Sequence, residues 1–168
     1  MSAHIPGDQA RVTVLVMVAP SEAFGLFTEE IDQWWRNGRK FRAGERGRSV
    51  VHLEPRVGGR MFESYQVATG PVLLQIGLVT VWEPPARLVF EWRASNFSAD
   101  EKTEVEVTFV ASASGTSVTV CHRGFAALRK DHPVRHGAEA PAFIRAMGMW
   151  WADQLSSLRE RALEQPTD

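Results

Sequence analysis

Two titratable side chains occupy positions from which they could move protons or orient a ligand, Glu63 and His122. Glu63 alternates in step with Met61 and Tyr65 along one predicted strand, so these three side chains share a face. If that face is concave, the carboxyl group lies in an apolar cleft, where burial disfavours its charged form and suits it to proton transfer. If the parity is reversed, Glu63 is solvated and Phe62 lies inside.

His122 shares its strand parity with Val118 and Val120, which predicts an inward-facing ring near the end of that strand. Two roles are open for it: a hydrogen bond to backbone at the sheet edge, or a contact to a ligand. Together with Glu63 it would also supply the acid and base of a cyclase- or hydrolase-like enzyme.

Motifs of the common enzyme and metal sites are weak or missing. His132 and His136 have the spacing of helical metal ligands, but Pro133 lies between them and disfavours a helix. The sequence has neither a G-x-S-x-G nucleophile elbow nor a glycine-rich dinucleotide turn. The single cysteine, Cys121, excludes an internal disulfide, and its parity opposite to Val120 predicts a packed or idle thiol on the convex side. We therefore name no catalytic residue, expect no metal and no cofactor, and favour a non-enzymatic protein.

The overall charge is nearly balanced, with 19 Lys and Arg against 20 Asp and Glu and a formal net charge of −1. Such a charge does not attract nucleic acid or an anionic membrane, so we expect neither as a partner. The basic segment 36–48 is interpreted as a solvated surface loop, with phosphate or carboxylate binding as the alternative. No apolar run approaches the roughly 20 residues of a membrane-spanning helix, and residues 1–11 lack the apolar centre of a signal peptide. We expect a cytoplasmic protein.

Hydrophobic periodicity assigns the elements that position these side chains. Residues alternating at period two indicate strands, and apolar residues at spacings of three and four indicate helices. Ser21 and Thr28 are predicted to cap two short helices, the second of which ends at Gly38. The predicted strands cover 11–18, 49–54, 60–66, 72–82, 87–92, 103–110 and 116–122, and a long amphipathic helix covers 142–163.

Short turns between consecutive strands imply an antiparallel meander, whose apolar face must be covered. The long C-terminal helix is the element best suited to cover it. We predict an α+β fold in a single domain over 1–168, with its core at about 11–163. A curved antiparallel sheet of six to seven strands wraps around the C-terminal helix, and two short helices follow the first strand.

A sheet that curls around one helix leaves a concave space, which is the default site for a ligand. The chain has six Trp and nine Phe against one Tyr, so aromatic rings either fill this space or line it. Trp34, Trp35, Trp150 and Trp151 are open to both roles. The predicted contacts to a small hydrophobic or aromatic ligand are Met61, Glu63, Tyr65, Phe90, Val107, Phe109, His122, Met147, Trp151 and Leu155.

Six segments, in order over about residues 11–163, resemble one known family. They are VAPSEAF at 18–24, FT through WW at 27–35, VGGRM at 57–61, WEPPARLVFEW at 82–92, GT through HRGF at 115–125, and Trp151 with Leu155 and Leu158. The chain resembles the SRPBCC (START-like, helix-grip) superfamily, and within it the bacterial family related to the activator of the ninety-kilodalton heat-shock chaperone's ATPase. One departure is visible: Trp150 stands where the family has a glycine, and Gly148 lies two residues earlier.

The resemblance implies a curved sheet gripping a C-terminal helix, in agreement with the periodicity. It implies three candidate functions, because one fold supports several. We favour non-enzymatic binding of a small hydrophobic or aromatic ligand between sheet and helix. The alternatives are a chaperone ATPase co-activator or adaptor acting through its surface, and the enzyme using Glu63 and His122. A chaperone is thus a second candidate partner, and the chain is expected to be a monomer or a homodimer.

Overall fold

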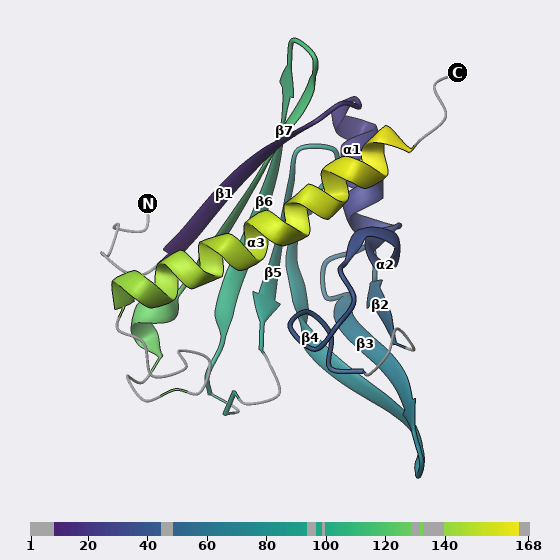
Figure 1. Cartoon of the computed structure of the whole chain (residues 1–168), viewed down its shortest axis with the longest axis vertical. Helices are drawn as coiled ribbons and strands as arrows, with labels where there is room; N and C mark the ends of the chain where they lie inside the picture. The colour runs from purple at the N-terminus through teal and green to yellow at the C-terminus, as the bar shows by residue number, and fades with distance from the viewer. Residues whose placement is uncertain are drawn as a thin grey trace.

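The computed structural model describes residues 9–44, 49–93, 97–98, 100–128, 132 and 140–164. One seven-stranded antiparallel sheet has the strand order β1-β7-β6-β5-β4-β3-β2. From β2 to β7, consecutive strands lie side by side, whereas β1 pairs with β7 at the edge opposite to β2. The predicted α+β architecture is confirmed (Figure 1). The strands are β1 Gln9–Val16, β2 Val50–Leu53, β3 Arg60–Val67, β4 Gly70–Glu83, β5 Arg87–Trp92, β6 Thr103–Ser112 and β7 Gly115–Arg123, and the helices are α1 Pro20–Thr28, α2 Ile31–Trp34, the 3-10 turn η1 Phe125–Ala127 and α3 Ala140–Leu163.

Helix α3 runs across one face of the sheet, with α1 and α2 beside its C-terminal half (Figure 1). The predicted amphipathic character of this helix is confirmed, because apolar residues at spacings of three and four lie on one side of it and are buried there. Burying each large member stabilises the fold by about 1.5–3 kcal/mol. Phe143, Trp151, Leu155, Leu158 and Ala162 are buried, and Met147 is half-buried.

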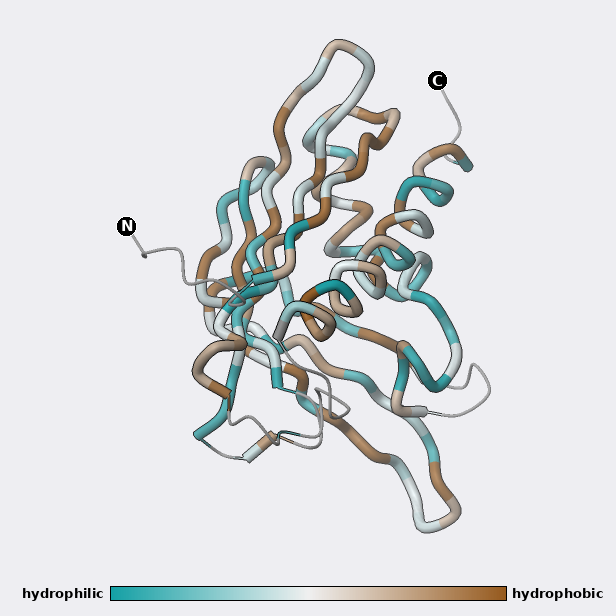
Figure 2. The backbone as a smooth tube through the Cα atoms, turned by 60° about the vertical axis from the view of Figure 1, so that its left-hand side comes forward, coloured by the Kyte–Doolittle hydropathy of each residue, from teal (hydrophilic) through white to brown (hydrophobic). Residues whose placement is uncertain are grey.

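Strict alternation along β6 and β7 builds the other side of this core. Val107 faces Val120 and Phe109 faces Val118 across the two strands, and all four side chains are buried. The intervening residues face away from α3, where Arg123 forms ion pairs with carboxylates of the neighbouring strand. Figure 2 shows the same alternation as hydrophobic and hydrophilic residues following one another along the strands.

The predicted helix boundaries near the N-terminus are wrong in detail. Helix α1 begins at Pro20 with Ala19 as its N-cap, so Ser21 does not cap it. Proline suits the first turn because its φ is preset and its missing N–H would be unpaired there. Thr28 ends α1 instead of capping the next helix, and its hydroxyl donates to the Phe24 carbonyl at 2.7 Å. Helix α2 ends at Trp34, four residues before Gly38.

In the part of the chain that the structure describes, no helix combines the length and the apolar character that crossing a bilayer requires.

Candidate functional site

Four indole rings meet between the sheet and the middle of α3. Trp35 follows α2 directly, Trp92 ends β5, and Trp150 and Trp151 are neighbours in α3. Every pair among the four has its ring centroids between 5.0 and 6.1 Å apart. We call these four residues the tryptophan cluster. Rings packed this closely leave no room for another molecule at the centre.

Exposure divides the tryptophan cluster into an inner and an outer pair. Trp35 and Trp151 are 3% and 0% exposed. Trp92 and Trp150 are only partly buried, and Phe41 packs against the outer side of Trp150 with a centroid separation of 5.6 Å. Parts of two indole rings therefore reach the protein surface while they pack against buried rings. A flat apolar molecule could stack there, because aromatic pairs gain energy beyond simple burial.

Residues 36–44, which we call the cover loop, lie over the tryptophan cluster and connect it to α3. The Trp35 indole N–H donates to the Phe41 carbonyl at 3.0 Å, and the Trp150 indole N–H donates to the Lys40 carbonyl at 2.8 Å. The Arg36 backbone N–H donates to Oε1 of Gln154 at 2.9 Å. The position of this loop thus decides how much of the cluster is covered.

Arg42 holds the cover loop from within, which corrects the interpretation of segment 36–48 as simply solvated. Its side chain is 3% exposed and forms an ion pair with Asp32 at 2.6 Å. The remaining guanidinium N–H groups donate to the backbone carbonyls of Asp32, Trp35, Arg36 and Ser49. A rigid fork of donors can satisfy several carbonyls at once, so burial of this charge is compensated. Residues 45–48 of the basic segment lie outside the described residues.

Glu63 ties the same loop to β3. The side chain is 3% exposed, which confirms the buried orientation. Its carboxylate accepts the backbone N–H of Ala43 at 2.8 Å and that of Gly44 at 3.4 Å. No side chain fits at Gly44, because a Cβ there would lie 2.6 Å from the Ser49 Cβ. Loop and strand are therefore in close contact at this point.

His122 is completely buried beside the cluster, and its ring bonds to two other side chains. The expectation of a backbone hydrogen bond at the sheet edge is wrong, because β7 is paired on both sides, with β1 and with β6. Nδ1 accepts the Trp151 indole N–H at 3.0 Å, so Nε2 carries the proton and donates to the Thr103 hydroxyl at 2.7 Å. Burial lowers the pKa of His122 from 6.5 to about 3.

These bonds weaken the acid–base hypothesis for Glu63 and His122. The carboxylate is engaged by loop amides, and both ring nitrogens of His122 are engaged by Trp151 and Thr103. A neutral ring whose lone pair already accepts a bond is a poor general base at neutral pH. Both groups instead fix the surroundings of the tryptophan cluster.

The other predicted contact residues lie on the concave side of the sheet and on α3. Met61, Phe90, Val107, Phe109 and Leu155 are buried in the main core, while Tyr65 and Met147 are partly exposed. The predicted contacts did not include Trp92, although it has the same strand parity as Phe90, and they did not include Gln154. A glutamine between Trp151 and Leu155 interrupts the apolar stripe of α3, which is the signal that could have found it.

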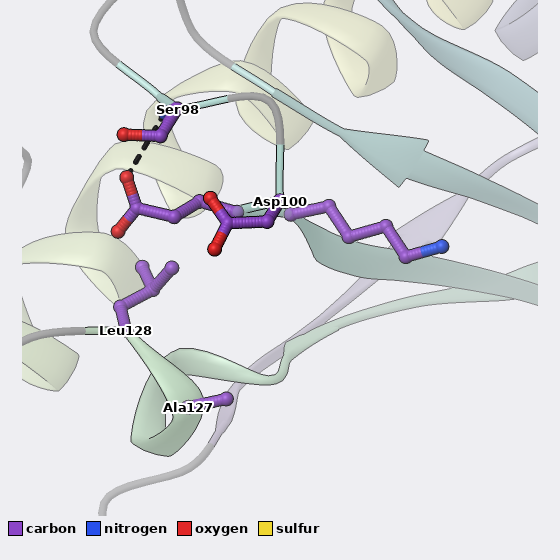
Figure 3. A pocket seen from close by; sticks show the side chains of 6 residues that line it. Ser98, Asp100, Ala127 and Leu128 are labelled. Carbon is purple, nitrogen blue, oxygen red and sulfur yellow. Dashed lines mark hydrogen bonds between the residues drawn. The ribbon is translucent and has the colours of Figure 1, made fainter.

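Two hollows lie away from the cluster. One of about 440 Å³ is lined by Ser98, Asp100, Glu101, Lys102, Ala127 and Leu128 between the β5–β6 connection and η1 (Figure 3). In it the Ser98 backbone N–H donates to Oε1 of Glu101 at 2.9 Å. The other, about 330 Å³, lies between residues 17–20 and the β6–β7 turn. Neither is lined by a predicted contact residue.

Of the two histidines with metal-ligand spacing, His132 is buried, with Nε2 3.4 Å from Oε1 of Glu101, and His136 lies outside the described residues. Among the residues with described positions, no group of three or more His, Cys, Asp or Glu is arranged to hold a metal ion.

Comparison with solved structures supports the fold. A protein of Nitrosomonas europaea superposes with a TM-score of 0.65 at 13% identity, covering 98% of this chain and 100% of that chain. A protein of Mesorhizobium loti gives 0.63 at 18% identity, covering 95% and 99%. The Aha1 dimer of Colwellia psychrerythraea, determined in solution, gives 0.59 at 15% identity, covering 90% and 93%.

No curated protein matches this sequence significantly. The model of one protein family does match, over residues 18–147. This range contains strands β2 to β7 and two members of the tryptophan cluster, Trp35 and Trp92, and it ends in the first turns of α3. The chain therefore belongs to the family described as Activator of Hsp90 ATPase homolog 1-like protein, of the SRPBCC, helix-grip type.

Proposed function

We propose that this protein binds a small apolar or aromatic molecule at the tryptophan cluster, between the sheet and α3. The observation that carries the proposal is the partial exposure of Trp92 and Trp150 above the buried rings of Trp35 and Trp151. A ligand resting on the outer pair gains aromatic contact from indoles that the inner pair holds in place. Large, rigid rings lose little conformational entropy when they bind.

Trp150 is the ring best placed to move when a ligand arrives. Its indole N–H donates to the Lys40 carbonyl of the cover loop, whereas the indole of Trp151 is fixed by His122. A small shift of Trp150 together with the cover loop would widen the exposed surface of Trp92 and Trp150. The ligand then stacks on these two indoles, and both remain contacts.

A thermal-shift screen with aromatic, steroid, flavonoid and fatty-acid compounds, followed by tryptophan fluorescence, tests the proposal. A ligand that binds only the folded state raises its melting temperature in a dose-dependent way. We expect Trp150→Ala to weaken binding about tenfold, which corresponds to roughly the energy of one aromatic contact. Trp82→Phe is the matched control, because Trp82 is also partly buried but packs on Phe24 outside the cluster. Absence of any shift across the panel, or equal losses in both variants, refutes the proposal.

The family match favours one second candidate, an accessory protein for a chaperone ATPase. The test adds this protein to an Hsp90-type chaperone and measures the ATPase rate. A rate that rises in proportion to the amount of complex recovered by pull-down would support this second candidate. The solved Colwellia relative is a dimer, so light scattering should accompany both assays and report whether the active species is a monomer or a homodimer.

A further inference from the structure

Gln154 is a fully buried amide that is satisfied on only one side. It is 0% exposed, and its Oε1 accepts the Arg36 backbone N–H at 2.9 Å. Its Nε2 has no hydrogen-bond partner among the described residues. Buried donors in native proteins are almost always paired, so an amide of this kind marks a place where an acceptor oxygen belongs.

This amide belongs to the same part of the molecule as the tryptophan cluster. Gln154 follows Trp150 by four residues in α3, so both side chains leave the helix on the same side. The chain segment that bonds to Gln154 begins directly after Trp35, another member of the cluster. A ligand ring stacked on Trp92 and Trp150 would therefore lie about one helical turn from Gln154. A substituent on that ring would extend towards Gln154 Nε2.

The cover loop adds positive charge at this position. Lys40 is 61% exposed on its side chain and pairs with Asp153, itself 53% exposed, at 3.3 Å. An exposed ion pair is weak and exchanges partners readily. Arg36 also reaches this turn of α3, where its Nε donates to the Asp153 carbonyl at 2.6 Å. Two cations that bond to Asp153, the residue before Gln154, favour an anionic acceptor over a neutral one at this turn of α3.

We infer that the ligand of this site is an aromatic carboxylate, with its ring on Trp92 and Trp150 and a carboxylate oxygen accepting from Gln154 Nε2. The inference rests on the proposed function, since it needs the ring to bind at the tryptophan cluster. Lys40 contributes by charge, exchanging Asp153 for the bound carboxylate. The ligand class is therefore set by a donor from α3 and a cation from the cover loop.

Three probes with one ring system test this assignment by calorimetry: 1-naphthylacetate, the neutral 1-naphthylacetamide, and 1-ethylnaphthalene, which lacks an acceptor. We expect the acetate to bind at least tenfold more tightly than 1-ethylnaphthalene, with the amide between them. The acetate affinity should fall with added salt, because the charge contribution of Lys40 is screened.

Two substitutions test the amide donor of Gln154 and the positive charge of Lys40 separately. Gln154→Glu keeps an acceptor for the Arg36 N–H but removes the donor, so it should abolish acetate binding and preserve 1-ethylnaphthalene binding. Lys40→Met should weaken the acetate several-fold and leave the amide unchanged. Gln75→Met, at an exposed position of β4, is the control and should change nothing.

The two proposals fail differently. If no probe binds the unaltered protein, the proposed function fails and this inference fails with it. If all three probes bind equally, or if Gln154→Glu retains acetate binding, the tryptophan cluster still binds aromatic rings but the carboxylate assignment is overturned.

Discussion

The buried ring of His122 should make the stability of this protein fall on mild acidification. Nδ1 accepts from Trp151, so protonation at that atom would set two donors against each other inside the core. The pKa of His122 is lowered to about 3 by burial, while an unfolded chain has the ordinary value of 6.5. The unfolded state therefore takes up a proton first as the pH falls.

The sign and size of the effect follow from this difference. Stability contributed by neutral His122 is complete above about pH 6.5 and is lost as the pH falls below it, by about 1.4 kcal/mol per pH unit. At pH 5 the loss is about 2 kcal/mol, or roughly 4–8 °C in melting temperature for a domain of this size. The loss continues until about pH 3, where the folded protein also accepts the proton.

Urea unfolding between pH 8 and pH 5 measures this contribution when the protein is compared with His122→Asn. The variant is less stable at every pH, because it loses a buried ring, but its stability should fall by about 2 kcal/mol less over this range. Thr103→Val removes the partner of Nε2 and keeps the titrating ring, so it should retain the full loss on acidification. Parallel pH curves for the unaltered protein and His122→Asn would refute the assignment of a buried, neutral His122.

Three further substitutions test the supports of the site. Arg42→Leu leaves the Asp32 carboxylate and several buried carbonyls without their cation, so we expect a loss of about 3–5 kcal/mol in urea unfolding; a loss under 1 kcal/mol would contradict the compensated burial of this charge. Glu63→Gln weakens the acceptor of two cover-loop amides, and hydrogen exchange at those amides should accelerate about tenfold while strand amides stay protected; unchanged exchange would show that the loop is held elsewhere. Leu158→Ala opens space in a fully buried part of the α3 stripe and should destabilise by about 2–5 kcal/mol, as measured by the same unfolding assay; a near-neutral result would mean that α3 is not anchored there.

Local pattern alone was sufficient for the main elements of the fold. Val105, Val107 and Phe109 alternate with polar residues, and the spacing itself decides that they share one buried face. The same reasoning predicts the α3 stripe, because helical geometry brings Trp151, Leu155 and their neighbours to one side. The predicted cap of the first helix is wrong because Pro20 begins that helix one residue earlier, which overrides the preference of Ser21 for an N-cap position.

Which side chains meet across the core was decided only by the tertiary structure. Trp35, Trp92 and Trp150 come from three elements distant in sequence, and no periodicity relates a residue after α2 to the end of β5. The basic segment predicts that Arg42 is a solvated cation. In the structure its side chain is buried among backbone carbonyls and anchors the cover loop. Sequence spacing determines the face on which a side chain lies, because the backbone period is local. Its partner is determined by packing between elements, because contact depends on how the strands and helices are placed against one another.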